Sequence, residues 1–379
     1  MPAGVIRVLH IARYRAPAME RKLELMAADP AFAFWLARPA VWEDEYGRRE
    51  VNPAVSGCRI LRLPMWGRAS DPHRALYRTL SFGMIAIRPH LIHAEEEPDS
   101  LAALQIALAR RLFAPRARLI LHTWQNVNRP KGWPVRAVLR ITLGAADAIL
   151  CANREGTRVL GEMGYRGPVE VIPPIGVDTR VFRPVERRPE PSAFRAAYAG
   201  RFVPEKGIEI LLQAAARLGP SVELWLIGGG PQQALLRSLA RELGIEERVR
   251  WVRSVPPERM PELLAQVDAL VLPSRTTPIW KEQFGRVLVE AMACGVPVVG
   301  SDSGAIPEVM GDAGLIFPEG DAAALADRLR RLMEDPGLRR ELGERGYRRA
   351  VSLYSQEVIA GRTLDFYRKI MGRGSSGDQ

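Results

Sequence analysis

The chain has 379 residues, of which 47% are hydrophobic and 26% charged, a balance typical of globular proteins that argues against a disordered chain. This length exceeds what one hydrophobic core usually organises, so two domains are expected. The three cysteines, Cys58, Cys151 and Cys294, lack any disulfide-framework or zinc-ribbon spacing and favour a reducing, cytoplasmic location. We expect no signal peptide, and no window approaches the roughly 18 apolar residues of a membrane span.

The formal net charge of +11 is concentrated in the first half of the chain. Residues 1–185 contain 27 Lys and Arg against 17 Asp and Glu, whereas residues 186–379 contain 27 against 26. A basic first half indicates an anionic partner, either a membrane surface, a phosphorylated acceptor or a nucleic acid, unless the charges only solvate the surface. The arginines are not interleaved with aromatic residues and follow no nucleic-acid-binding motif, so we expect no nucleic-acid partner.

Short β-rich runs alternate with helical stretches along the first half. We predict strands at 6–11, 91–93, 119–122, 148–150 and 169–172, and helices that include 100–113 and 136–143. Strands that alternate with helices predict βαβ units and a parallel sheet. The first half is therefore expected to form one α/β domain, residues 1–185.

The same alternation restarts after a segment rich in proline and charge, residues 183–192, which we interpret as a linker. The second half has predicted strands at 194–199, 222–227, 249–252, 269–272 and 297–300, and predicted helices at 207–218, 232–243, 261–265, 284–294, 322–333 and 336–371. We assign residues 186–354 to this second domain and 372–379 to a flexible tail. Two doubly wound sheets predict a ligand-binding cleft between their carboxyl edges.

One loop in the second half combines two cations with a helix start. The sequence GRFVPEKG, residues 200–207, follows a predicted strand and opens a predicted helix, with Arg201 and Lys206 at its two ends. A helix N-terminus favours anions through its unpaired amides and its dipole. The arrangement therefore predicts a diphosphate site; an exposed surface pair is the alternative.

A second segment places two glutamates eight positions apart. Glu282 follows a predicted strand, and Glu290 lies about two turns into the next helix. Carboxylates accept hydrogen bonds from sugar and ribose hydroxyls, and the amides at 284–286 would point at a phosphate. A solvated helix face is the alternative, which the surrounding apolar residues make less attractive.

Three stretches resemble glycosyltransferase family 4: EQFGRVLVEAMACGVPVVGSDSGAIPEV with its E-x7-E motif, the loop GRFVPEKGI, and the segment IPPIGVDTRVFRP. The resemblance extends from about residue 90 to 370 and is strongest in the second half. It implies an α/β, GT-B fold with two Rossmann-like domains, a nucleotide-sugar donor in the second domain, and a last helix, within 355–371, that crosses back to the first. It also implies transfer with retention of anomeric configuration.

The family's site residues can be carried over to matching positions. Arg201 and Lys206 match its diphosphate-binding cations, and Glu282 matches the carboxylate that faces the donor sugar. The other donor-side matches are Gly200 in the phosphate loop, Phe284 and Gly285 as backbone donors with Arg286 beside them, Glu290 on the ribose, and Val255 as a backbone contact to the base. The glycines at 228–230 could serve either a tight turn or a ligand contact.

The first domain departs from the family pattern in two places. The loop after the first strand has arginines, Arg13 and Arg15, where the family often has two glycines, so these side chains are candidates to reach the phosphate or the acceptor. Glu96 stands where the family often has a histidine; it could accept a hydroxyl hydrogen bond or act as a base, or belong to a solvated acidic run. His93 is assigned to a strand end, and His122 to either the cleft or the core.

The expected reaction is hexosyl transfer from a nucleotide-diphosphate sugar to a hydroxyl acceptor that is a glycan, a lipid-linked sugar or a small molecule. No D-x-D triplet is present, so fixed cations and a helix terminus are expected to replace a metal ion, and no cofactor is expected. A nucleotide-sugar epimerase and a non-catalytic nucleotide-sugar-binding protein remain alternatives.

Peripheral contact with an anionic membrane is a further hypothesis, on the inner face of the membrane. Arg110, Arg111, Arg116 and Arg118 surround Leu112 and Phe113, a mixture that suits a lipid surface. The alternative is that Leu112 and Phe113 are ordinary core residues.

Overall fold

A computed structural model describes residues 4–14, 19–44, 47–50, 54–71, 73–185 and 193–372. The chain divides into two compact units: unit 1, Met1–Ile175 with Gln356–Gln379, and unit 2, Gly176–Ser355. The first boundary lies ten residues before the predicted one, because the amide of Val177 donates to the carbonyl of Tyr354 (2.8 Å) and Val177 forms a β-bridge with Ser355. Most of the predicted linker, 186–192, and the tail from 373 lie outside the described residues.

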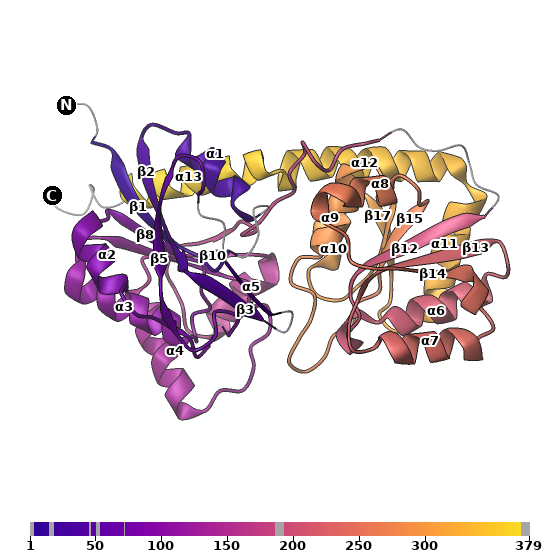
Figure 1. The fold of residues 1–379 in the computed structure, drawn as a ribbon, viewed down its shortest axis with the longest axis horizontal. Helices are drawn as coiled ribbons and strands as arrows, with labels where there is room; N and C mark the ends of the chain where they lie inside the picture. The colour runs from indigo at the N-terminus through magenta and orange to yellow at the C-terminus, as the bar shows by residue number, and fades with distance from the viewer. Residues whose placement is uncertain are drawn as a thin grey trace. The chain divides into compact units, whose positions relative to one another are not determined.

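Unit 1 is built on a parallel sheet of seven strands in the order β11-β10-β9-β8-β1-β2-β5 (Figure 1). The strands are β1 (Ile6–Ile11), β2 (Phe32–Pro39), β5 (Cys58–Leu63), β8 (Leu91–Ala94), β9 (Arg118–Thr123), β10 (Ala148–Cys151) and β11 (Val169–Val171). Two short hairpins accompany the sheet, β3 (Val41–Asp44) with β4 (Gly47–Glu50) and β6 (Met65–Trp66) with β7 (Leu76–Tyr77).

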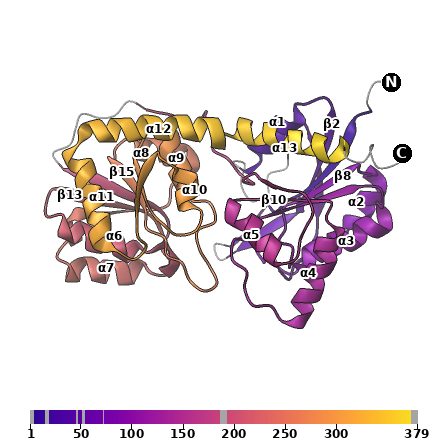
Figure 2. The same cartoon turned by 180° about the vertical axis from the view of Figure 1, so that it is seen from behind.

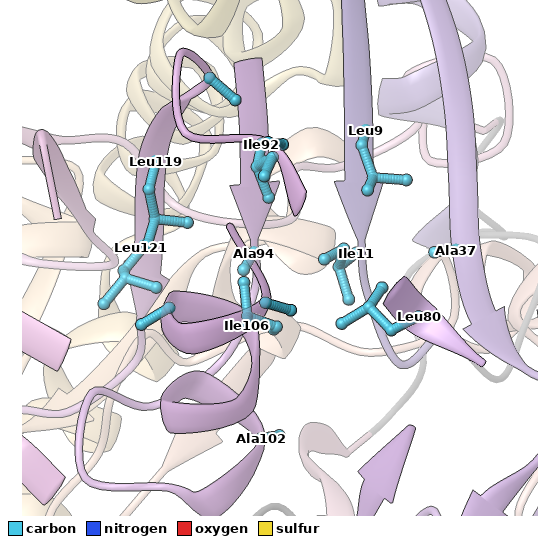
Figure 3. Packing of buried hydrophobic residues seen from close by; sticks show 14 of the residues in the cluster. Leu9, Ile11, Ala37, Leu80, Ile92, Ala94, Ala102, Ile106, Leu119 and Leu121 are labelled. Carbon is cyan, nitrogen blue, oxygen red and sulfur yellow. The ribbon is translucent and has the colours of Figure 1, made fainter. Parts of the chain in front are cut away.

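Helices cover both faces of this sheet. The helices are α1 (Arg21–Ala27), α2 (Leu80–Ile87), α3 (Leu101–Phe113), α4 (Trp133–Ala145), α5 (Arg154–Glu162) and α13 (Gln356–Gly372). On one face, α2, α3, α4 and α5 bury Leu80, Ile106, Leu139 and Leu160 in one hydrophobic cluster; Figure 3 shows Leu80 and Ile106 packed on the sheet residues of that cluster. On the other face, α1 packs against α13 in a second cluster. The last helix therefore belongs to unit 1.

Unit 2 repeats the architecture with a parallel sheet of six strands in the order β14-β13-β12-β15-β16-β17. The strands are β12 (Phe194–Arg201), β13 (Val222–Gly229), β14 (Val249–Val252), β15 (Ala269–Leu272), β16 (Val298–Ser301) and β17 (Gly314–Phe317). The helices are α6 (Ile208–Arg217), α7 (Gln233–Glu242), α8 (Met260–Leu264), α9 (Arg286–Ala293), α10 (Ile306–Met310), α11 (Ala322–Glu334) and α12 (Pro336–Tyr354) (Figure 2). Short 3₁₀ turns precede α6, β14 and α8: η2 (Pro204–Lys206), η3 (Glu246–Arg248) and η4 (Pro257–Arg259).

The helical stretch predicted over 336–371 consists of two helices, α12 and α13, separated by Ser355, and α13 corresponds to the predicted last helix within 355–371. Ser355 has extended backbone angles, φ −63° and ψ 150°, which end the helical hydrogen-bond series. The break falls where Tyr354 and Ser355 pair with Val177. Among the helices of the described ranges, none combines the length and hydropathy needed to cross a membrane.

Candidate donor site in the second unit

The last residues of β12 and β13 and the segments that follow them are packed close together. Gly228 has φ 137°, and a Cβ there would lie 2.0 Å from the carbonyl oxygen of Gly200. A Cβ at Gly230 would lie 2.6 Å from the carbonyl oxygen of Phe202. This backbone packing explains why glycine is required at 228 and 230, and at Gly200 a Cβ would lie 2.7 Å from the Tyr198 hydroxyl.

Lys206 is held at the beginning of α6 by a second close approach. It ends η2, and the next residue, Gly207, has φ 62°. A Cβ at Gly207 would lie 2.1 Å from the carbonyl oxygen of Pro273, so only glycine allows the loop after β12 to press against the loop after β15. Lys206 Nζ donates to Glu282 Oε2 at 2.6 Å and lies 4.8 Å from the centre of the Trp280 ring.

Glu282 is fixed by three loops of unit 2. Its carboxylate accepts from Lys206 in the loop after β12 and from the Ser274 hydroxyl, 2.8 Å away, in the loop after β15. Its backbone carbonyl accepts from the amide of Ala305, 2.9 Å away, in the loop after β16. Gly304 has φ 54°, and a Cβ there would lie 2.2 Å from that carbonyl oxygen. The Glu282 side chain is 9% exposed, so a buried carboxylate with a defined orientation lies at the sheet edge.

The helix after Glu282 begins at Arg286, two residues later than predicted, with Gly285 as its N-cap at φ 75°. The amides of the first turn of a helix have no acceptor inside the helix, and the dipole makes this end positive. Phe284, predicted as a backbone donor, has a buried ring that packs edge-on against Tyr354 with ring centres 5.5 Å apart. The ring therefore anchors the start of α9 and leaves any donor role to backbone atoms.

Glu290 lies one turn into α9 and is largely enclosed. Its carboxylate is 3.0 Å from Arg286 Nε, with 12% of the Glu290 side chain exposed against 51% for Arg286. Burial raises the pKa of the Glu290 carboxyl, and the neighbouring guanidinium opposes that shift. A buried carboxylate next to a guanidinium is suited to accepting hydrogen bonds from two neighbouring hydroxyl groups.

Arg201 and Val255 stand at the same edge of the sheet. Arg201 is the exposed last residue of β12, and Val255 follows β14 in a partly exposed loop. Because β12, β13 and β14 are parallel, the segments after them emerge on one side. Near them, Trp251 packs edge-on against Phe202 and stacks under Arg237 at 4.4 Å.

The sequence did not identify Ser274, Trp280 and Gly304 as parts of this site. Ser274 could have been found, because it follows the apolar strand β15 and lies at the edge where parallel sheets bind ligands. The partnership of Gly304 with the backbone of Glu282 depends on how two loops pack, which no local pattern reveals.

In unit 1, Glu96 and Arg13 bind each other. Arg13 Nε donates to Glu96 Oε1 at 2.7 Å, and the Tyr77 hydroxyl donates to the same oxygen at 2.9 Å. Arg13 Nη1 also donates to the carbonyls of Ala69 and Asp71. Glu96 is 3% exposed, and burial raises the pKa of its carboxyl against the opposing effect of Arg13. Nε and Nη1 of Arg13 are thus engaged within unit 1, and Arg15 lies outside the described residues.

His122 is buried in the sheet of unit 1, not at its edge. Its Nδ1 is 3.1 Å from Nε2 of His93, and its Nε2 is 2.7 Å from the carbonyl oxygen of Ile172. His93, the expected strand-end residue, also hydrogen-bonds the hydroxyl of Tyr367 in α13. Burial lowers the pKa of His122 to about 3, so the ring is neutral at physiological pH. Of the two roles left open for His122, this environment favours the core.

His93, Glu95 and His122 could hold a metal ion by distance alone, since their ligand atoms lie within 4.8 Å of one another. However, the buried ammonium of Lys22 donates to Glu95 at 2.8 Å and to the carbonyl of Pro174 at 2.6 Å. A fixed cation on the same carboxylate repels a metal ion. The ammonium of Lys22 therefore already neutralises the Glu95 carboxylate in the place that a metal ion would take.

Comparison with known proteins agrees with this geometry. A family model described as "Glycosyl transferases group 1" matches residues 182–349. An MMP alpha-(1->4)-mannosyltransferase of Mycolicibacterium hassiacum is 37% identical over 208 residues, which are 53% of this chain and only 49% of that protein. A GDP-mannose-dependent alpha-(1-6)-phosphatidylinositol monomannoside mannosyltransferase of Mycolicibacterium smegmatis is 32% identical over 325 residues, 77% of this chain and 79% of that protein.

The fold comparison extends over both units. The solved structure of sucrose-phosphate synthase from Thermosynechococcus elongatus matches with a TM-score of 0.75 at 22% identity, covering 97% of this chain and 100% of that one. The two parallel sheets and their covering helices agree with this match. With the E-x7-E segment, the loop at 200–207 and the long alignments to named transferases, the chain belongs to the group 1 glycosyltransferases and is a transferase with the GT-B fold.

Proposed function

We propose that this enzyme transfers a hexosyl group from a nucleotide-diphosphate sugar, bound by unit 2, to a hydroxyl acceptor, with retention of anomeric configuration and without a metal ion. The observation that carries the proposal is the shared edge where Lys206 and Ser274 orient the buried carboxylate of Glu282. An anchored carboxylate suits the hydroxyls of a donor sugar, and an adjacent ammonium suits its diphosphate.

The proposed role of the cations is to stabilise the leaving diphosphate. As the anomeric C–O bond breaks, negative charge grows on the diphosphate, and fixed donors aimed at it lower the barrier. Lys206, Arg201 and the first-turn amides of α9 are the candidate donors in unit 2. Glu290, enclosed beside Arg286, is proposed to accept hydrogen bonds from the ribose hydroxyls.

Retention is proposed without an enzyme nucleophile. Glu282 already accepts two side-chain hydrogen bonds, one from an ammonium, which lowers its nucleophilicity. A phosphate oxygen of the donor can instead take the acceptor proton on the face from which the leaving group departs. Such a mechanism asks unit 2 to orient the donor and to stabilise charge, and these are the properties that its residues offer.

The acceptor is proposed to belong to a cell-envelope glycan. Names of relatives support this: one is a phosphatidylinositol monomannoside mannosyltransferase, and another, from Rhizobium meliloti, is a lipopolysaccharide core biosynthesis glycosyltransferase that is 31% identical over 297 residues. Because GDP-mannose appears in the first name, it is the first donor to test.

A turnover assay tests the proposal. The purified protein is incubated with each of a panel of nucleotide sugars and with lipid-linked and soluble glycan acceptors, and release of nucleoside diphosphate is followed. We expect acceptor-dependent release with one donor, and NMR of the product should show the anomeric configuration of the donor. Donor binding without release for any acceptor would instead indicate a binding protein, and an inverted product would refute retention.

A further inference from the structure

Helices α2, α3 and α4 lie side by side on one face of the sheet of unit 1, where α2 contacts α3 and α3 contacts α4 (Figure 2). The segments that carry them, residues 73–94 and 100–146, contain 11 Lys and Arg and no Asp or Glu. The two segments are separated by Glu95, Glu96, Glu97 and Asp99, but the second alone, residues 100–146, is long for an acid-free run in a chain that is 26% charged. We refer to the solvent-facing side of these three helices as the basic layer.

Most of the cations in these segments are not neutralised by carboxylates elsewhere in unit 1. Arg110 and Arg118 pair with Asp147, and Lys131 lies 3.8 Å from Asp99. The guanidinium of Arg78 lies over the ring of Trp66. The other seven are exposed and form no ion pair with any carboxylate of the described residues: Arg74, Arg88, Arg111, Arg116, Arg129, Arg136 and Arg140. Three of these seven lie in helices of the layer, Arg111 in α3 and Arg136 and Arg140 in α4, and the other four lie in the adjoining segments. Arg110 and Arg118, which the predicted positive face included, are instead paired with Asp147.

Large apolar side chains are exposed among these arginines. Phe82 in α2 is 74% exposed, Leu112 in α3 is 71% exposed, and Trp133 at the start of α4 is 75% exposed. The two segments contain nine of the 16 exposed large hydrophobic side chains of the described residues. Leu112 and Phe113, at 71% and 41% exposed, are not the core residues that the alternative interpretation required.

These side chains point away from the sheet. In each helix the buried residues face the sheet, Met84 in α2, Ile106 in α3 and Leu139 in α4. The exposed residues of the same helices must therefore lie on the outer side of the layer. An apolar groove of about 350 Å³ opens beside α3 and is lined by Leu76, Leu101, Leu104, Leu108 and Leu112.

We propose that the basic layer is a docking surface for an anionic lipid bilayer. Stable peripheral binding combines apolar side chains that enter the interface with cations that attract anionic headgroups, and this layer supplies both. A second copy of the chain fits less well, because pairing two such faces would bring Arg111, Arg136 and Arg140 against the same three arginines of the other copy. The inference does not depend on the proposed sugar-transfer chemistry, since lipid binding needs no nucleotide sugar.

Vesicle co-sedimentation of the whole protein tests the proposal. We expect the protein to sediment with vesicles of phosphatidylcholine and phosphatidylglycerol at low salt, and not with phosphatidylcholine alone. The variant Arg111→Gln/Arg136→Gln/Arg140→Gln should bind the anionic vesicles on the order of 100-fold more weakly, because each arginine near the surface contributes roughly fivefold. Its matched control, Arg217→Gln/Arg340→Gln/Arg348→Gln, removes three exposed arginines of unit 2 and should bind as the wild type does.

A second set of variants tests the apolar side chains. Phe82→Ser/Leu112→Ser/Trp133→Ser should weaken binding at high salt more than at low salt, whereas Leu235→Ser/Ile279→Ser, at exposed positions of unit 2, should not. Thermal unfolding and nucleoside-diphosphate binding, unchanged in every variant, would show that the fold and the donor site are intact. Absence of binding to anionic vesicles, or equal loss in the controls, would overturn the proposal. A wild-type dimer that the serine variant converts to a monomer would also overturn it, in favour of a second copy.

Discussion

Gly304 lies against the backbone of Glu282 so closely that only a residue without a side chain fits. A Cβ at position 304 would lie 2.2 Å from the carbonyl oxygen and 2.9 Å from the amide nitrogen of Glu282. The amide of Ala305 donates to that same carbonyl. The loop after β16 therefore sets the position of a carboxylate that belongs to the loop after β15.

Gly304→Ala should lower kcat/KM for the nucleotide sugar at least tenfold by moving Glu282, because the clash is with backbone that cannot yield locally. The control is Gly219→Ala, which has a similar positive φ of 72° but open space around its Cβ. It should cost about 1 kcal/mol of stability through the left-handed backbone alone and leave turnover unchanged. Equal kinetic effects of the two variants would mean that Gly304 acts only through backbone strain.

The two glutamates of the E-x7-E segment should bind different parts of the donor, Glu282 the sugar and Glu290 the ribose. Glu282→Gln should reduce sugar transfer while leaving the affinity for free nucleoside diphosphate nearly intact. Glu290→Gln should weaken both, because ribose is common to the two ligands. Isothermal titration with nucleoside diphosphate and with nucleotide sugar, beside steady-state kinetics, separates the effects; identical ligand profiles would contradict the division.

Turnover should survive an excess of EDTA, because the proposed charge stabilisation comes from Arg201, Lys206 and the start of α9. The measurement is the initial rate before and after chelation, with magnesium and manganese added back. Loss of activity on chelation that either ion restores would overturn the metal-independent mechanism.

Glu97 should make stability depend on pH near neutrality. Burial raises the pKa of this carboxyl to about 7, from an ordinary value of 4.5, although the Thr123 hydroxyl and the Trp124 amide hydrogen-bond it. The folded state then keeps a proton that the unfolded chain releases, so this stabilisation is complete below about pH 4.5 and is lost as the pH rises through about 7.

The side chain that Glu97→Gln introduces cannot ionise. The free energy of unfolding of this variant should therefore rise, relative to that of the wild type, by on the order of 2 kcal/mol between about pH 5 and pH 8. Urea unfolding at both pH values measures the difference, with Glu162→Gln, at an exposed carboxylate, as the control. An unfolding free-energy difference from the wild type that is the same at both pH values would show that Glu97 does not titrate in this range.

Local patterns were sufficient for most of the fold. Strands β1, β14 and β15 have the predicted bounds, because each is a short apolar run bordered by turn residues. Strands β2 and β5 were missed. Arg59 and Arg62 make β5 look polar, and β2 lies in an apolar stretch that fits a helix as well as a strand.

In the candidate site, too, some residues could be predicted from local patterns and others could not. Lys206 and Glu282 were identified from two separate motifs, 76 positions apart, and the fold joins them by a 2.6 Å hydrogen bond. The engagement of Arg13 by Glu96 and the burial of His122 were not predictable, because both depend on which side chains neighbouring strands bring together. The acid-free run at 100–146 was visible in the sequence, but its exposure required the packing of three helices.

The most direct test of the donor site is the affinity for nucleoside diphosphate, measured by titration calorimetry, in Arg201→Ala and Lys206→Ala. Each change would remove a proposed charge-assisted hydrogen bond to the diphosphate, so the proposal predicts binding about 10- to 100-fold weaker in each and a comparable or larger loss of kcat/KM. Lys369→Ala, at an exposed lysine of α13, is the control and should bind as the wild type does. Wild-type affinity in both Arg201→Ala and Lys206→Ala would contradict the account and remove this loop from the site.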